Sequence, residues 1–230
     1  MTRPRILDPQ AVPVIGTDEH LAAVAPSRLT AQSLRLRFSE ARSWQPEIPG
    51  DTVPAGHDLS AASVLVPLVQ RPDGLKVLLT QRSVHLRDHA GQIAFPGGRV
   101  EPEDADAVAA ALREAEEEIG LPRSTVDVLG LLPYYTTVTH YIVTPVVALV
   151  RPPFDLRLDA FEVAEAFEVP LDYLMTPAHH QRHEFEWQGQ RRQFLSMPWD
   201  GPDRDGQLRR YFIWGATAAM LRNFYRLLIA

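Results

Sequence analysis

The pattern of hydrophobic and polar residues changes near residue 60. Residues 1–57 contain seven prolines and show little periodicity, apart from residues 29–41, which predict one helix. A β-branched run then covers residues 64–69, turn-forming residues occupy 71–74, and a second apolar run covers 75–80, which together predict a β-hairpin. We therefore expect an N-terminal extension over residues 1–57 and a folded domain over residues 58–230.

Residues 104–120 have the strongest helical pattern in the chain. At about 100° per residue, the apolar side chains fall on one face and three glutamates fall on another. The apolar face comprises Val108, Leu112, Ala115 and Ile119, and the acidic face comprises Glu114, Glu117 and Glu118. Gly120 and Pro122 are typical of the end of a helix.

The downstream pattern predicts further strands and a closing helix. Strand-like runs cover residues 126–132 and 141–150, a hairpin is expected at 188–190, and a helix is expected over 211–228. His179, His180 and His183 are interpreted as loop residues and not as metal ligands. Strands that surround one helix, with a second helix closing the chain, predict a mixed α/β or α+β class.

Composition narrows the classes of function. The chain has 230 residues, no cysteine and a formal net charge of -6. The absence of thiols excludes disulfides and Cys-ligated metal centres, and it fits a cytoplasmic location. Acidic charge argues against nucleic-acid partners. No window approaches the roughly 18 apolar residues of a membrane span, so we expect no membrane association.

The acidic helix face suggests a metal site. Carboxylates at positions i, i+3 and i+4 repel one another on a free helix, and a bound divalent cation would reverse that effect. Oxygen ligands favour Mg²⁺ or Mn²⁺. The alternative is an ordinary solvated acidic face. Gly97 and Gly98 precede the helix and allow the backbone to approach a metal or a phosphate closely.

These residues, in this order, resemble the Nudix box. Gly98 is followed after five residues by Asp104, and residues 113–121 fit the second half of the pattern, Arg-Glu-Ala-Glu-Glu-Glu-Ile-Gly-Leu. There are two departures: an aspartate replaces the usual glutamate, and eight residues instead of seven separate it from Arg113. The longer spacing leaves Asp104 without an assigned role but keeps the acidic face intact.

The residues before the box are similar to the signature of the coenzyme A pyrophosphatase branch of the Nudix hydrolases. This segment includes Arg82, Arg87 and His89 and runs into residues 95–98, Phe-Pro-Gly-Gly. Residues 144–147 and 211–218 are also similar to that branch. The resemblance implies a Nudix fold over about residues 60–228, an α/β/α sandwich in which a mixed β-sheet lies between the box helix and the C-terminal helix.

The resemblance also implies roles for particular residues. Glu114 and Glu118 would be metal ligands, with Glu117 as a further ligand or as the group that positions the attacking water. Gly97 would offer its carbonyl, and Arg113 would orient the glutamates. Glu162 and Glu165, taken to follow the last strand of the sheet, are candidates for the general base. The expected substrate-binding residues are Arg82, Arg87, His89 and Gly98, which would hold the diphosphate or a ribose 3′-phosphate.

The expected activity is hydrolysis of coenzyme A or its derivatives to a 4′-phosphopantetheine species and adenosine 3′,5′-bisphosphate, with Mg²⁺ or Mn²⁺ as cofactor. One alternative is a Nudix pyrophosphatase that acts on another nucleoside diphosphate derivative, such as ADP-ribose, NADH or a dinucleoside polyphosphate. Another is a nucleotide-sensing Nudix protein without turnover. The sequence leaves open whether the chain forms a homodimer.

Overall fold

A computed structural model describes residues 6, 8–40, 43–51, 58–86 and 89–230. Its main sheet has the strand order β4-β3-β2-β8-β6, to which β9 adds beside β3, β5 beside β2 and β7 beside β8. The strands are β2 (Ser60–Arg71), β3 (Gly74–Arg82), β4 (Ile93–Ala94), β5 (Gly97–Arg99), β6 (Val126–Leu131), β7 (Tyr135–Thr136), β8 (Tyr141–Val150) and β9 (Val163–Pro170). Because β2 and β8 run parallel and their other neighbours run antiparallel, the sheet is mixed, as expected.

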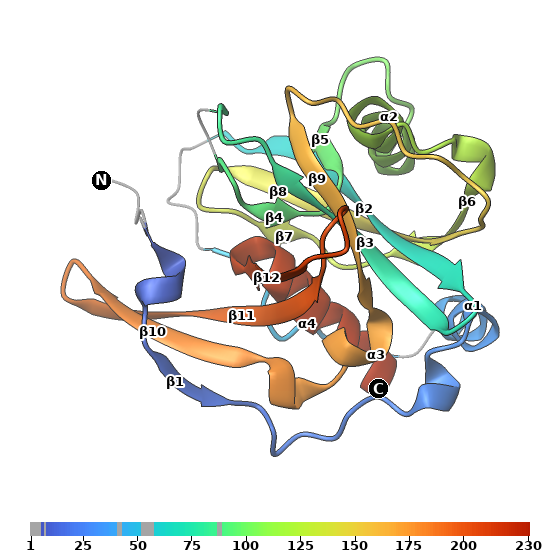
Figure 1. Ribbon diagram of the computed structural model, residues 1–230. Helices are drawn as coiled ribbons and strands as arrows, with labels where there is room; N and C mark the ends of the chain where they lie inside the picture. The colour runs from blue at the N-terminus through green and yellow to red at the C-terminus, as the bar shows by residue number, and fades with distance from the viewer. Residues whose placement is uncertain (1–5, 7, 41–42, 52–57, 87–88) are drawn as a thin grey trace.

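Helices cover both faces of the main sheet (Figure 1). Side chains alternate along a strand, so Leu65 and Val69 of β2 pack with helix α2 (Ala107–Ile119), while Val66 and Leu68 pack with helix α4 (Gly215–Ile229). The continuous apolar run of β2 is thus a strand buried on both faces. This arrangement confirms the predicted α/β/α sandwich.

A second, antiparallel sheet packs against α4. It contains β1 (Val14–Thr17), β10 (Gln181–Trp187), β11 (Gln190–Pro202) and β12 (Leu208–Trp214), in that order. Leu195, Met197 and Ile213 join the same core as α4. The predicted hairpin at residues 188–190 is confirmed: Gln188 and Gly189 have φ angles of 52° and 72°, which suit a two-residue turn between twisted strands.

Two predicted elements differ from the structure. Tyr211–Trp214 closes β12, and the C-terminal helix begins only at Gly215, because alternate residues of this run, Tyr211 and Ile213, face the core as they do in a strand. Glu165 does not follow the last strand of the sheet. It lies within β9, which pairs antiparallel with β3, so that prediction was wrong. The strand was missed because a buried glutamate, Glu165, interrupts the alternation of apolar residues that marks a strand.

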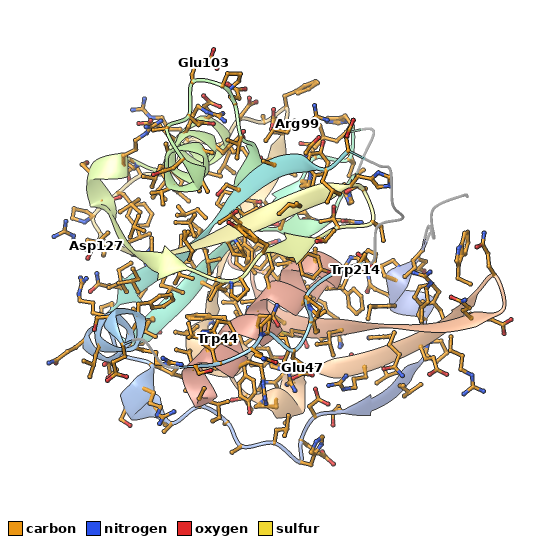
Figure 2. The ribbon with its side chains drawn as sticks, turned by 180° about the vertical axis from the view of Figure 1, so that it is seen from behind. Trp44, Glu47, Arg99, Glu103, Asp127 and Trp214 are labelled. Carbon is orange, nitrogen blue, oxygen red and sulfur yellow. The ribbon has the colours of Figure 1, made fainter. Side chains whose placement is uncertain are left out.

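Residues before the main sheet pack closely against α4. Helix α1 (Ala31–Ser39) contributes Leu34, which is fully buried, and Val24 and Leu29 join the same core. Glu47, labelled in Figure 2, pairs with Arg222 of α4 at 2.7 Å. The predicted boundary between residues 57 and 58 adjoins residues 52–57, which lie outside the described part, and it stays a prediction. Among the described residues, no helix is long and apolar enough to span a membrane.

Candidate active site

Glu118 is a buried carboxylate at the end of α2. One of its oxygens accepts a hydrogen bond from the backbone N–H of Gly97 at 3.1 Å, and the other lies 3.7 Å from Nη1 of Arg82. Burial raises the pKa of Glu118 to about 7, and repulsion from Glu114 and Glu162 acts in the same direction, while Gly97 and Arg82 oppose it. Three carboxylates from α2 and from the loop before β9 therefore share one electrostatic environment.

Glu114 lies directly over the two glycines of β5, which form a strand paired with β2 and not the turn expected from the sequence. A Cβ atom on Gly98 would lie 2.4 Å from Oε1 of Glu114, so only a glycine allows this approach. Gly97 has a φ of +156°, and a Cβ there would lie 2.4 Å from the carbonyl oxygen of Ser63 on β2. Burial raises the pKa of Glu114, with Arg113 opposing the change and Glu117 adding to it.

Arg113 joins the acidic face to the loop between β5 and α2, in which Figure 2 labels Glu103. Its Nε and Nη2 donate to the two carboxylate oxygens of Asp104 at 3.0 and 2.9 Å. Its Nη1 donates to Glu114 at 3.1 Å and to Glu117 at 3.0 Å. The bond to Asp104 raises the pKa of Arg113, which keeps the guanidinium charged. A single arginine thus orients two box glutamates, and Asp104 fixes that arginine in turn.

Glu165 does not join the Glu114 and Glu118 carboxylates. On β9, Val163 and Ala166 pack on the α2 side of the sheet, whereas Glu165 is buried on the side that faces β12. There it accepts hydrogen bonds from Arg209 and from the Tyr211 hydroxyl, both at 2.8 Å. Of the two candidates for the general base, only Glu162 contributes to the raised pKa of Glu114 and Glu118.

A pocket of about 280 Å³ opens beside this site. Its walls come from β3, β9 and the turn between β11 and β12. It is lined by Gln81, Arg82, Val84, Ala164, Glu165, Asp203, Arg204, Asp205 and Arg209. Arg82 borders both the pocket and Glu118, so the two regions adjoin. Arg209 was missed at the level of sequence because the helix predicted from residue 211 hid the strand alternation that places Arg209 and Tyr211 on one face.

A model of the NUDIX domain family matches residues 59–188. The chain belongs to the Nudix hydrolase family. Proteins named "Uncharacterized Nudix hydrolase NudL" from Escherichia coli strain K12 and from Shigella boydii serotype 18 are each 47% identical over 164 residues, which cover 70% of this chain and 79% of each relative. Among solved structures, a Nudix hydrolase from M. smegmatis, RenU, is 24% identical with a TM-score of 0.44, covering 55% of this chain and 86% of that one.

Nudix hydrolases as a family need divalent cations, and the donor chemistry of this site fits one. The nearby ligands are carboxylate oxygens, which Mg²⁺ and Mn²⁺ prefer. A buried carboxylate such as Glu118, with its raised pKa, is stabilised in its charged form by a cation. Within the described residues, no three acidic or imidazole side chains already stand arranged as a cation site. Arg113 bonds only one oxygen of Glu114 and one of Glu117, so the second oxygen of each carboxylate is available to a cation.

The structure treats the other predicted substrate-binding residues differently. His89 is exposed, has a φ of 59°, and its Nδ1 lies 2.8 Å from Oε1 of Gln92. Arg87 falls outside the described residues. Gly98 lies against Glu114, as described above, so of the predicted substrate-binding side chains Arg82 is the one that the structure brings to the acidic face.

The histidines near residue 180 have structural partners. His180 accepts a hydrogen bond from Arg222 at 3.0 Å, and its other nitrogen lies 2.8 Å from the Leu174 carbonyl oxygen. His183 lies within β10, so its interpretation as a loop residue was wrong, and its two nitrogens contact Val12 and Ser196. Both imidazoles are buried with both nitrogens engaged in these contacts.

Proposed function

We propose that this Nudix hydrolase cleaves the diphosphate bond of coenzyme A or its derivatives, giving a 4′-phosphopantetheine species and adenosine 3′,5′-bisphosphate. The observation that carries the proposal is the position of Arg82. This residue belongs to the segment similar to the coenzyme A branch, and its guanidinium lies 3.7 Å from Glu118 of the Nudix box. The two motifs, which are separate in sequence, therefore form adjoining parts of one site.

The box residues supply the metal-binding groups. Glu114 and Glu118 would hold the cation, with Glu117 and the carbonyl of Gly97 as further ligands. When bound, Mg²⁺ or Mn²⁺ would neutralise charge on the diphosphate and make water more acidic. Arg113, held by Asp104, would keep Glu114 and Glu117 in position for the cation.

For the general base we favour Glu162 over Glu165. Glu162 is half-buried in the loop before β9 and raises the pKa of Glu114 and Glu118, so its carboxylate lies within electrostatic reach of the metal-binding face. Glu165 already accepts hydrogen bonds from Arg209 and Tyr211. A base must reach the water that it deprotonates, and these two donors hold the Glu165 carboxylate on the other face of the sheet.

Substrate contacts would come from Arg82 and from the glycines of β5. The Arg82 guanidinium suits bidentate contact with phosphate oxygens, and Gly98 allows close approach of the backbone. His89 and Arg87, from the same signature, would complete the binding of the diphosphate or the ribose phosphate. A cytoplasmic location is part of the same proposal.

The test is a substrate panel under both metals. Purified protein is incubated with Mg²⁺ or Mn²⁺ and with coenzyme A, ADP-ribose, NADH or diadenosine tetraphosphate, and products are separated by chromatography. We expect adenosine 3′,5′-bisphosphate from coenzyme A at the highest kcat/KM. Turnover of ADP-ribose or a dinucleoside polyphosphate without turnover of coenzyme A would reassign the substrate class.

Two glutamates of the same helix provide a matched pair of variants. Glu118→Gln should lower kcat by orders of magnitude while the fold is retained. Glu116→Gln is the control. Glu116 is exposed, does not belong to the acidic face, and pairs with Arg123 at 2.7 Å. Nucleotide binding with no turnover of any substrate by the unmodified protein would favour the sensing alternative.

A further inference from the structure

The pocket beside the acidic face has a wall that the family signature does not include. This wall is formed by Arg209 near the start of β12 and by residues 203–205 of the turn that precedes it. Arg82 also lines the pocket and lies 3.7 Å from Glu118. A ligand group in the pocket would therefore lie about one side chain away from a diphosphate at the box glutamates.

Arg209 is held in one orientation by contacts from both sheets. Its Nη1 donates to Glu165 at 2.8 Å and its Nη2 donates to Gln81 at 2.9 Å. The guanidinium carbon lies 5.5 Å from the centre of the Tyr211 ring, which stacks on Phe167 with 3.8 Å between ring centres. These bonds use two of its five N–H donors, so the fixed guanidinium retains donors for a ligand.

Two of the three carboxylates that line the pocket are hydrogen-bonded, and the third, Asp205, is exposed and lies 3.8 Å from Arg204. Glu165 accepts from both Arg209 and Tyr211. Asp203 accepts the backbone N–H groups of Asp205 and Gln207 at 2.9 and 2.8 Å, which closes the turn. By contrast, Nε of Arg82 is buried and makes no hydrogen bond within the described part of the chain. Arg82 and Arg209 therefore keep N–H donors at the pocket that an anion can use.

We propose that this pocket binds a phosphomonoester of the substrate, separate from the diphosphate that is cleaved, and that Arg209 is the residue that selects for it. The inference rests on the proposed function, in which the substrate carries a ribose 3′-phosphate. Glu165 is then a positioning residue, because it fixes Arg209 and does not touch the reacting atoms. Val84 and Ala164 provide apolar contact beside the phosphate.

The test compares ligands that differ only in the second phosphate. Binding of adenosine 3′,5′-bisphosphate and of AMP is measured by calorimetry for the unmodified protein, Arg209→Gln and Arg210→Gln. Arg210 is the control, since it lies on the opposite face of β12, is 57% exposed and pairs with Asp200. We expect Arg209→Gln to weaken binding of the bisphosphate by roughly tenfold to a hundredfold, as for the loss of a charge-assisted hydrogen bond, and to leave binding of AMP unchanged.

Kinetics give the second readout. In Arg209→Gln, KM for coenzyme A should rise to that for 3′-dephospho-coenzyme A, with kcat little changed for either. Equal effects on both members of each ligand pair, or an equal effect of Arg210→Gln, would overturn the assignment of Arg209. If the unmodified protein cleaves neither coenzyme, the proposed function fails, and the calorimetric comparison still decides whether the pocket binds a phosphomonoester.

Two controls distinguish the loss of a phosphate contact from a folding defect in the Arg209 variant. The thermal midpoint of each variant is measured, and Arg209→Lys, which keeps the positive charge, is tested alongside Arg209→Gln. Partial recovery of preference for the bisphosphate in the lysine variant supports a direct contact with phosphate. No recovery, together with a lowered midpoint in both variants, would assign Arg209 a purely structural role and overturn the proposal.

Discussion

Asp104 accepts two hydrogen bonds from Arg113, at 3.0 and 2.9 Å, in a fork-to-fork arrangement. Asp104 precedes α2, whose N-cap is Asp106, so its carboxylate reaches Arg113 from the loop and not from the helix. Its other contact is a bond from the backbone N–H of Glu101 at 2.8 Å, and the bond from Arg113 is the main reason that its pKa is lowered. The two departures from the Nudix pattern, an aspartate in place of glutamate and one additional residue before Arg113, thus both involve residues of this ion pair.

The first prediction concerns this pair. Asp104→Asn should lower kcat/KM by roughly tenfold to a hundredfold, the usual cost of losing a group that orients a ligand, because Arg113 would no longer hold Glu114 and Glu117 in position. Steady-state kinetics over a range of Mg²⁺ concentrations will check this. Asp104→Glu should recover part of the activity. Unchanged kinetics in Asp104→Asn would show that Arg113 is oriented without Asp104.

The second prediction concerns Gly98. A Cβ at this position would lie 2.4 Å from the Glu114 carboxylate, which is a flexible side chain, so Gly98→Ala should fold and displace Glu114. We expect a lower kcat and a higher Mg²⁺ concentration for half-maximal activity. Gly16→Ala is the control, because a Cβ at Gly16 meets no atom within 4 Å. Equal metal dependence in both variants would contradict the contact between Gly98 and Glu114.

The third prediction separates the two candidates for the general base. Glu162→Gln should lower kcat by roughly 10²- to 10⁴-fold, the usual contribution of general base catalysis. Glu165→Gln should mainly raise KM, because it loosens Arg209, and should leave kcat little changed. The reverse pattern would return the role of base to Glu165.

The fourth prediction concerns the stability of the protein in acid. His180 is buried, and burial lowers its pKa from 6.5 to about 4. The charged and polar groups that face it are Arg222, Asp18, His179 and the edge of the Tyr225 ring. Because the unfolded chain binds a proton near pH 6.5 and the folded chain does not, the stabilisation is present above pH 6.5 and is lost as pH falls towards 4.

The lost stabilisation amounts to at most about 3 kcal/mol. Denaturant unfolding of the unmodified protein and of His180→Gln at several values between pH 7 and pH 4 will measure it. Absolute stability is expected to be lower in the variant, since Arg222 loses its bond to the ring, so only the slopes are compared. Parallel slopes would show that His180 does not control the loss.

Local pattern was sufficient for the parts of the molecule that depend on neighbours in sequence. The spacing of Glu114, Glu117 and Glu118 places them on one face of α2 in any helix. The apolar runs at residues 64–69 and 75–80, separated by turn-forming residues 71–74, predict a hairpin. The Nudix box was visible for the same reason. These features agree with the structure because local backbone geometry alone sets which side chains share a face.

Only the tertiary structure decided which faces meet. Glu165 and Arg209 are 44 residues apart, and their ion pair depends on how the second sheet packs on the first. The helix predicted over 211–228 concealed β12, because an aromatic run such as 211–214 suits a buried helix as well as a strand. Likewise, the contact between Asp104 and Arg113 depends on the path of a loop. Sequence periodicity reports that a face is buried, but the partner of that face is set by packing between distant segments.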